Sequence, residues 1–150
     1  MFQDKDPGRI FLTRVGQGAN MVNACFLNWK GKKPLGGIMP FLGMVPLSWS
    51  EIDSYNPNFE VLQQTPILIT IGGNDPTLPE SVATQSYTYY YIHLYQTAAA
   101  KSLYKGYNNP GVFPKVGSFA DLYNENIVLR NKKFLEEYLK AEFPEPDEPE

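Results

Sequence analysis

The side chains that could carry covalent or acid–base chemistry are few and lie far apart in the sequence. The chain has a single histidine, His93, and a single cysteine, Cys25. A serine or cysteine nucleophile needs an adjacent base to become reactive, and none stands near Cys25 or near Ser48, Ser50 and Ser54. Cys25 also falls on an expected helix face, where a buried thiol is inert. Zinc sites draw on clusters of cysteine, histidine and carboxylate. None is visible, so we expect neither a metal site nor a cofactor.

Two glycine-rich stretches remain as candidates for a site. Val15-Gly16-Gln17-Gly18-Ala19 follows an apolar, β-prone run and precedes a helical pattern, which indicates a tight turn from strand to helix. A phosphate-binding loop would carry a lysine and a serine or threonine after its glycines, and this stretch carries neither. Gly73-Asn74-Asp75-Pro76 ends the most apolar strand of the chain. Asp75 is therefore either a plain turn residue or an acid presented at a strand end.

Strand and helix patterns alternate along the chain. The expected strands are Arg9–Thr13, Leu35–Val45, Pro66–Ile71 and Ser102–Tyr104, and the expected helices are Ala19–Trp29, Glu80–Ala100 and Leu122–Lys140. The first helix should bury one face that carries Met21, Val22, Cys25, Phe26 and Trp29. A polar loop, or a loop that contains a helical turn, is expected over Ser48–Phe59, and a Pro/Gly loop over Asn108–Val116. Because Pro66–Ile71 is apolar on both faces, it should be a central parallel strand. The order β-α-β-β-α-β-α predicts an α/β fold with a parallel sheet.

Length, charge and hydropathy exclude several function classes. The chain has 150 residues, which suits one core. We expect an α/β domain over residues 1–142 and an acidic, proline-rich tail over residues 143–150. Thirteen basic and sixteen acidic residues give a net charge of −3 without a basic patch, so we expect no nucleic-acid partner. No apolar run reaches the ~20 residues that a membrane span needs.

Four motifs, in the same order, resemble the acyl-protein thioesterase or phospholipase/carboxylesterase branch of the α/β-hydrolases. Phe11 to Ala19 resembles the family's strand, Gly-Phe-Ser-Gln-Gly-Gly turn and helix, and Leu35 to Pro46 resembles its next strand. Pro66 to Pro76 is similar to the family's Pro-Val-Leu-x-x-His-Gly-x-x-Asp-Pro, and Tyr104-Lys105-Gly106 to the Tyr-x-Gly before its catalytic histidine. The resemblance implies a partial α/β-hydrolase, with a parallel sheet of about four strands flanked by helices.

The departures from the family pattern imply that the catalytic machinery is degenerate. Gly16 stands where the resemblance places the serine nucleophile of G-x-S-x-G. Arg14 replaces the first glycine of that motif. Asp75 matches the triad acid, but the histidine position falls near Asn109, and an amide cannot accept the serine's proton. We therefore expect an inactive pseudo-hydrolase.

The resemblance also implies a truncated form, because a complete member has several strands and an oxyanion loop before the nucleophile strand. Ile10, Phe11, Leu12 and Thr13 would then form an exposed sheet edge, which needs a covering partner. We expect these residues to bind another chain. Arg14 should point away from the core and pair with Asp75 or with an acid of the partner.

The aromatic share of 14% is high enough to supply anchors for such a partner. Tyr87, Tyr90, Tyr91 and Trp49 are the candidates around the exposed edge, and the sequence does not say which of them face outward.

The leading hypothesis is a structural or interaction subunit of a larger protein assembly. The alternative is a binder of lipid or acyl ligands, or a residual carboxylesterase or thioesterase, and a split enzyme completed by another chain is a third option. A single cysteine and the absence of a signal-peptide core favour an intracellular location, in the cytoplasm or an organelle, over secretion. Nothing in the residues chooses between, for example, a mitochondrial and an axonemal complex.

Overall fold

A four-stranded parallel sheet forms the centre of the protein. The computed structural model describes residues 6–94, 111–113, 115–117 and 119–140. The strands lie in the order β1-β2-β3-β4, and their bounds are β1 Phe11–Val15, β2 Gly37–Phe41, β3 Thr70–Gly72 and β4 Gly111–Phe113. All three pairings are parallel. The predicted fold class, a parallel sheet of about four strands flanked by helices, is confirmed.

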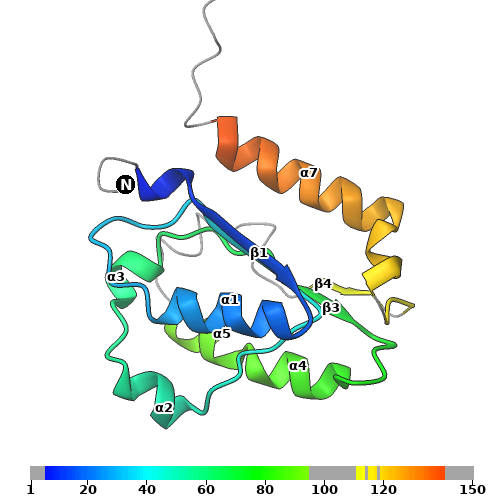
Figure 1. Cartoon of the computed structure of the whole chain (residues 1–150), viewed down its shortest axis with the longest axis horizontal. Helices are drawn as coiled ribbons and strands as arrows, with labels where there is room; N and C mark the ends of the chain where they lie inside the picture. The colour runs from blue at the N-terminus through cyan, green and yellow to red at the C-terminus, as the bar shows by residue number, and fades with distance from the viewer. Residues whose placement is uncertain (1–5, 95–110, 114, 118, 141–150) are drawn as a thin grey trace, which may run out of the picture.

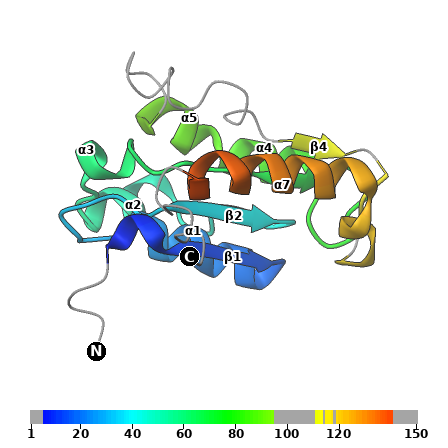
Figure 2. The same ribbon diagram turned by 90° about the horizontal axis from the view of Figure 1, so that it is seen from above.

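Helices cover both faces of this sheet (Figures 1 and 2). On one face lie α1 Gln17–Leu27, α4 Glu80–Ser86 and α5 Thr88–Leu94, and on the other lies α7 Glu125–Lys140. The shorter elements are η1 Pro7–Arg9, α2 Trp49–Ser54, α3 Phe59–Leu62 and η2 Phe119–Tyr123. Each face of the sheet therefore has its own apolar cluster. One includes Phe26, Ile38 and Tyr90, and the other includes Phe41 and Phe134.

Two expected loops contain regular structure. The segment Ser48–Phe59, expected as a loop or a loop with a helical turn, contains α2, which Ser48 and Glu51 cap with a reciprocal capping box. The segment expected as a loop over Asn108–Val116 contains β4, which pairs with β3. The strand expected over Ser102–Tyr104 lies outside the described residues.

The expected helix over residues 80–100 is interrupted within its described part. Helix α4 ends at Ser86 and α5 begins at Thr88, with Tyr87 between them. The hydroxyl of Tyr87 meets the side chain of Asn23, 64 residues away in the sequence.

Strand β3 is shorter than the predicted strand Pro66–Ile71 because of a proline in its neighbour. Ile38 and Leu42 of the β2 segment donate their N–H groups to Pro66 and Thr70. Pro40 lies between them and has no N–H to donate. The ladder is therefore interrupted, and Ile67 forms only an isolated bridge with Ile38.

Strand β1 is at one end of the sheet. The N–H of Gly16 donates to the carbonyl of Phe41, and the carbonyl of Ile10 accepts from Gly36, so the even-numbered residues of this segment bond to β2. Since alternate residues of a strand direct their backbone groups to opposite sides, Phe11, Thr13 and Val15 direct theirs outward. We call these three residues the open edge.

Candidate functional site

The turn between β1 and α1 has the geometry of a strand-to-helix elbow. Gly16 has φ 62° and ψ −127°, and its carbonyl accepts from the N–H groups of Ala19 and Asn20 at 3.0 and 3.3 Å. A positive φ of this kind strains any residue with a side chain. A Cβ built on Gly16 would nevertheless meet no atom within 4 Å. The elbow therefore has space for a nucleophile, but the residue present has none.

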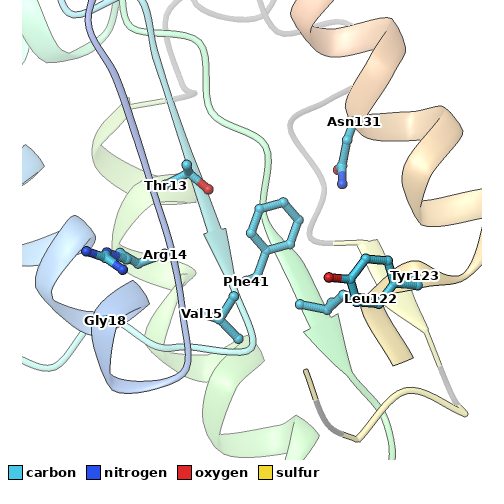
Figure 3. Close-up of a pocket in the computed structure, with 8 residues that line it drawn as sticks. All are labelled: Thr13, Arg14, Val15, Gly18, Phe41, Leu122, Tyr123 and Asn131. Atoms are coloured by element: carbon cyan, nitrogen blue, oxygen red, sulfur yellow. The ribbon is translucent and has the colours of Figure 1, made fainter. Parts of the chain in front are cut away.

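Gly18 and Arg14 occupy the two outer positions of the elbow motif. A Cβ on Gly18 would lie 2.9 Å from the Cβ of Arg14, so Gly18 allows α1 to approach β1 closely. The aliphatic part of Arg14 packs over Gly18, and the residue as a whole is exposed. Figure 3 shows Arg14 pointing toward α1, on the opposite side of β1 from Phe41. Arg14 thus points out of the core.

A second strained turn lies against the elbow. Leu42, directly after β2, has a φ of 54°, which is uncommon for a residue with a side chain. A Cβ on the next residue, Gly43, would lie 3.1 Å from the carbonyl oxygen of Gly16 and still closer to Ala19. The N–H of Met44 donates to the Oδ1 atom of Asn20 at 2.8 Å. These contacts hold the elbow in place from the β2 side.

Asp75 is occupied by its own turn. Its Oδ1 atom accepts from the N–H and the hydroxyl of Thr77, at 2.9 and 2.8 Å, and from the N–H of Leu78 at 3.1 Å. Partial burial raises the pKa of Asp75, but these hydrogen bonds together lower it below its ordinary value. Within the described residues, no carboxylate lies within ion-pair distance of Arg14. The expected ion pair between Arg14 and Asp75 is therefore wrong.

The segment after β4 meets the Asp75 turn. The N–H of Asn74 donates to the carbonyl of Val116 at 3.0 Å, and a Cβ on Gly117 would collide with the carbonyl of Asn74. A triad histidine follows the acid in chain order, but residues 114–118 read Pro-Lys-Val-Gly-Ser. Asn109, the position that the resemblance suggested, lies outside the described residues.

His93 belongs to an aromatic cluster on α5. Its ring stacks on Phe59 at 5.4 Å between centroids and lies 4.2 Å from the ring of Tyr89 and 5.8 Å from that of Trp49. None of these residues lines the elbow or the grooves beside β1. Packing therefore accounts for His93, the only histidine of the chain.

Two grooves flank the open edge. The larger, of about 650 Å³, lies between β1 and α7, and we call it the α7-side groove (Figure 3). Its lining residues are Thr13, Arg14, Val15, Gly18, Phe41, Leu122, Tyr123 and Asn131. The smaller, of about 350 Å³, lies between β1 and α1, and we call it the α1-side groove. Its lining residues are Phe11, Leu12, Thr13, Arg14, Gly18, Met21, Val22 and Cys25.

The residues expected to bind a partner lie at or beside these grooves. Ile10, Thr13 and Arg14 are exposed, and Phe11 and Leu12 are half-buried. The sequence pattern was wrong about two residues of α1. Met21 and Cys25 were expected on the buried face, but Met21 is 63% exposed and Cys25 is exposed as well. The buried face of α1 instead includes Val22, Asn23 and Phe26.

The four expected aromatic anchors line neither of the two grooves. Tyr87 and Tyr90 are buried, and their hydroxyls hydrogen bond to Asn23 at 3.0 and 2.8 Å. Trp49 and Tyr91 are exposed but line neither groove. The exposed aromatic residue that lines the α7-side groove is Tyr123, which is 74% exposed and belongs to no periodic pattern in the sequence.

No protein-family model matches this chain, and no protein of curated function matches it by sequence. Its backbone is similar to SOBER1 of Arabidopsis thaliana, with a TM-score of 0.60 at 23% identity, over 91% of this chain and 56% of that chain. Two point variants of SOBER1 give TM-scores of 0.58 and 0.53 at 22% and 24% identity, over 91% and 89% of this chain and 57% and 56% of theirs.

This likeness establishes the fold, a partial α/β-hydrolase fold, and the chain spans a little over half the length of these structures. Among the described residues, no helix is long and apolar enough to cross a bilayer, and no cluster of three potential metal ligands occurs.

Proposed function

We propose that this chain is a non-catalytic protein of the α/β-hydrolase fold that acts as an interaction subunit of a larger assembly. The observation that carries the proposal is the elbow, whose backbone has the nucleophile geometry at Gly16 but holds no side chain. Acyl transfer in this fold needs a serine at the elbow and a histidine to take its proton. The segment that meets Asp75 contains no histidine. Removing triad members costs orders of magnitude in rate, so a binding role accounts better for the retained fold.

The binding surface of this proposal is the open edge with its two grooves. The outward backbone groups of Phe11, Thr13 and Val15 are available for a further strand, because β1 ends the described sheet. An exposed strand edge attracts other strands, and covering it is one of the ways in which native proteins prevent this. A partner chain that covers β1 would satisfy these groups.

The single thiol of the chain supports an intracellular location for this assembly. Cys25 is exposed and is the single cysteine of these 150 residues. Free thiols of this kind persist in reducing compartments.

Isolation of the native protein under mild conditions tests the proposal. We expect one or more partner proteins to co-purify at fixed stoichiometry, and a serine-reactive fluorophosphonate to leave the chain unlabelled. A label that maps to a single residue, or turnover of acyl-ester or thioester substrates above background, would refute the non-catalytic assignment. Purification as a lone monomer would refute the subunit role.

The second candidate is a binder of lipid or acyl ligands, or a residual hydrolase, and the α7-side groove favours it. This groove has a volume of about 650 Å³ and presents the apolar side chains of Val15, Phe41 and Leu122. Small-molecule sites have volumes of this order and apolar walls. Native mass spectrometry of the isolated protein separates the two candidates, because a bound lipid adds a defined mass.

A further inference from the structure

The open edge offers a regular set of hydrogen-bonding groups to an extended chain. Phe11, Thr13 and Val15 each direct one N–H and one carbonyl outward, at every second residue. An added strand would use these groups and would send its own side chains alternately to the two faces of the sheet. The α1-side and α7-side grooves lie beside β1 and share Thr13, Arg14 and Gly18 among their lining residues. One set of alternate side chains would face the α1 side of these grooves and the other set the α7 side.

The α1-side groove combines an apolar stripe with one unpaired cation. Met21 and Cys25 are exposed, one helical turn apart, and Leu12 is half-buried beside them. At the same groove stands Arg14, which has no carboxylate within ion-pair distance among the described residues. An arginine at the rim of an apolar groove favours a carboxylate, which it can bind through two parallel hydrogen bonds. This groove therefore suits an apolar side chain next to an acidic one.

The α7-side groove has an apolar wall, and the polar residues Thr13, Arg14 and Asn131 line it as well. Val15, Phe41 and Leu122 form its apolar wall, and Tyr123 lies at its exposed rim. The Oδ1 atom of Asn131 is buried and has no hydrogen-bond partner in the described part of the chain. An apolar side chain of moderate size fits this groove.

We propose that the occupant of the open edge is an extended, acidic–apolar segment of a different protein, which adds a fifth strand along β1. Alternate side chains of that segment are apolar and enter the α7-side groove. The remaining ones place an aliphatic group against Met21 and Cys25 and a carboxylate against Arg14. This inference rests on the proposed function, because it names the chemistry of the partner at that binding surface.

A second copy of this chain fits the same edge less well. The β1 sequence, Phe-Leu-Thr-Arg-Val, contains no acidic residue. In an antiparallel β1–β1 pair centred on Thr13, Leu12 would face Arg14 of the other copy, and both arginines would lie on the same face without a carboxylate. Like charges placed close together across strands are destabilising. The unpaired cation therefore favours a different, acidic partner.

The test uses the full chain and the acetylated, amidated peptide Thr-Val-Leu-Val-Glu-Val-Thr as a probe. Its valines share one face, and its leucine and glutamate share the other. We expect a dissociation constant of about 1 mM or lower. In NMR spectra, the amide chemical-shift changes should centre on β1 and the two grooves.

Arg14→Glu should raise this dissociation constant by about tenfold or more. Replacing the peptide's glutamate with lysine should restore binding to that variant. Lys32→Glu, the same charge change at an exposed position outside both grooves, should leave binding unchanged.

Two N-methylated peptides test the strand pairing itself. One carries the methyl group on the amide of the central valine, and the other on the amide of the glutamate. Because only alternate amides face β1, one of the two should lose binding and the other should keep it. Loss in both, loss in neither, or no binding of the parent peptide overturns the inference. If Arg14→Glu does not fold, the same contact is tested by measuring how the peptide with lysine in place of glutamate binds to the wild-type chain.

Failure of this inference and failure of the proposed function give different results. If the peptide does not bind but partners still co-purify with the native chain, the strand-addition inference is wrong and the subunit role stands. If the chain is labelled by a fluorophosphonate or purifies alone, the proposed function is wrong whatever the peptide does. A chain that forms a stable homodimer through β1, blocked by Thr13→Lys, would show that the occupant is a second copy.

Discussion

The surroundings of the segment leading into β3 and the surroundings of β1 differ in how completely this chain covers them. Ile67 and Leu68 are 0% exposed and Ile71 is 1% exposed, because helices of the same chain cover both faces. At β1, Ile10 is 36% exposed and Met21, on the adjoining helix, is 63% exposed. The difference shows that the described fold completes its core around β3 but leaves apolar surface uncovered at β1.

The polar groups of the two regions show the same difference. In the interior, Asn23 is fully buried, and its side chain donates to the carbonyl of Met44 and the hydroxyl of Tyr87 and accepts from the hydroxyl of Tyr90. Burial raises the pKa of Tyr87 well above its ordinary value, so this hydroxyl stays neutral. At β1, by contrast, Arg14 has no ion-pair partner among the described residues. The proposed partner would supply a carboxylate to Arg14, which the described part of the chain does not.

The largest expected effect comes from breaking the interior network. Asn23→Leu removes three hydrogen bonds and leaves the part-buried carbonyl of Met44 and the buried hydroxyl of Tyr87 without this partner. Since each buried group left unpaired costs about 1–3 kcal/mol, we expect the free energy of unfolding to fall by about 2–4 kcal/mol. Urea denaturation followed by circular dichroism measures it.

The matched control lies on the same helix at the open side. Met21→Ala should change the free energy of unfolding by less than about 0.5 kcal/mol, because the Met21 side chain is exposed in the chain alone. Equal losses for Asn23→Leu and Met21→Ala would contradict the contrast between the two regions.

A smaller loss is expected where α7 is fixed to the sheet. The guanidinium of Arg130 donates to the carbonyl of Ile69 at 2.9 Å and to the hydroxyl of Thr70 at 3.2 Å. Arg130→Met keeps much of the aliphatic volume and loses these charged donors, so unfolding should become easier by about 1.5–3 kcal/mol. Lys132→Met on the same helix removes only an exposed pair with Glu136 and should cost less than about 1 kcal/mol. Urea or thermal denaturation compares the stability of the two variants. A larger loss for Lys132→Met than for Arg130→Met would contradict the role of Arg130 in fixing α7 to the sheet.

The elbow offers a third comparison. Gly16→Ser and Gly16→Ala both put a side chain at a φ of 62°, so each should destabilise the chain by about 1–3 kcal/mol. No atom within 4 Å blocks the new Cβ, so the loss should come from backbone strain and be similar in the two variants. Neither should hydrolyse acyl esters. Esterase activity that appears with serine and not with alanine would show that the remaining machinery is intact.

The smallest expected effect is a change in how the free energy of unfolding depends on pH under acidic conditions. The pKa of Asp75 is lowered in the folded chain, so its contribution to stability is present above the unfolded pKa of about 3.9 and is lost as the pH falls through the folded pKa. Asp75→Asn keeps an acceptor oxygen for Thr77 and Leu78 but cannot titrate. Between about pH 6 and about pH 2, wild type should therefore lose more stability than Asp75→Asn. Parallel losses in the two proteins would show that the turn does not depend on the charge.

Local patterns predicted the elements whose burial follows from their own periodicity. The apolar run at Pro66–Ile71 indicated a central strand, and the turn over Gly16-Gln17-Gly18 correctly placed the elbow between β1 and α1. Strand β4 was missed because Gly111-Val112-Phe113 lies between two prolines and resembles a loop, and its pairing with β3 is a tertiary effect.

The exposure of the α1 stripe could not be read from the sequence. Spacing places Met21 and Cys25 on one face of the helix, but it does not say which neighbour covers that face. In the structure, the side of α1 toward β2 and α5 is covered, and the side beside the open edge is not. The same limit applies to Asn23, whose partners Tyr87 and Tyr90 lie more than sixty residues away.

Hydrogen exchange of the three outward amides of β1 tests the central claim most directly. The amides of Phe11, Thr13 and Val15 should exchange rapidly in the chain alone, while that of Leu12, which faces β2, is protected. In the native assembly, all three outward amides should become protected. If they are already protected in a monomeric chain, or still exchange rapidly in the assembly while other surfaces gain protection, the open edge is not the binding surface.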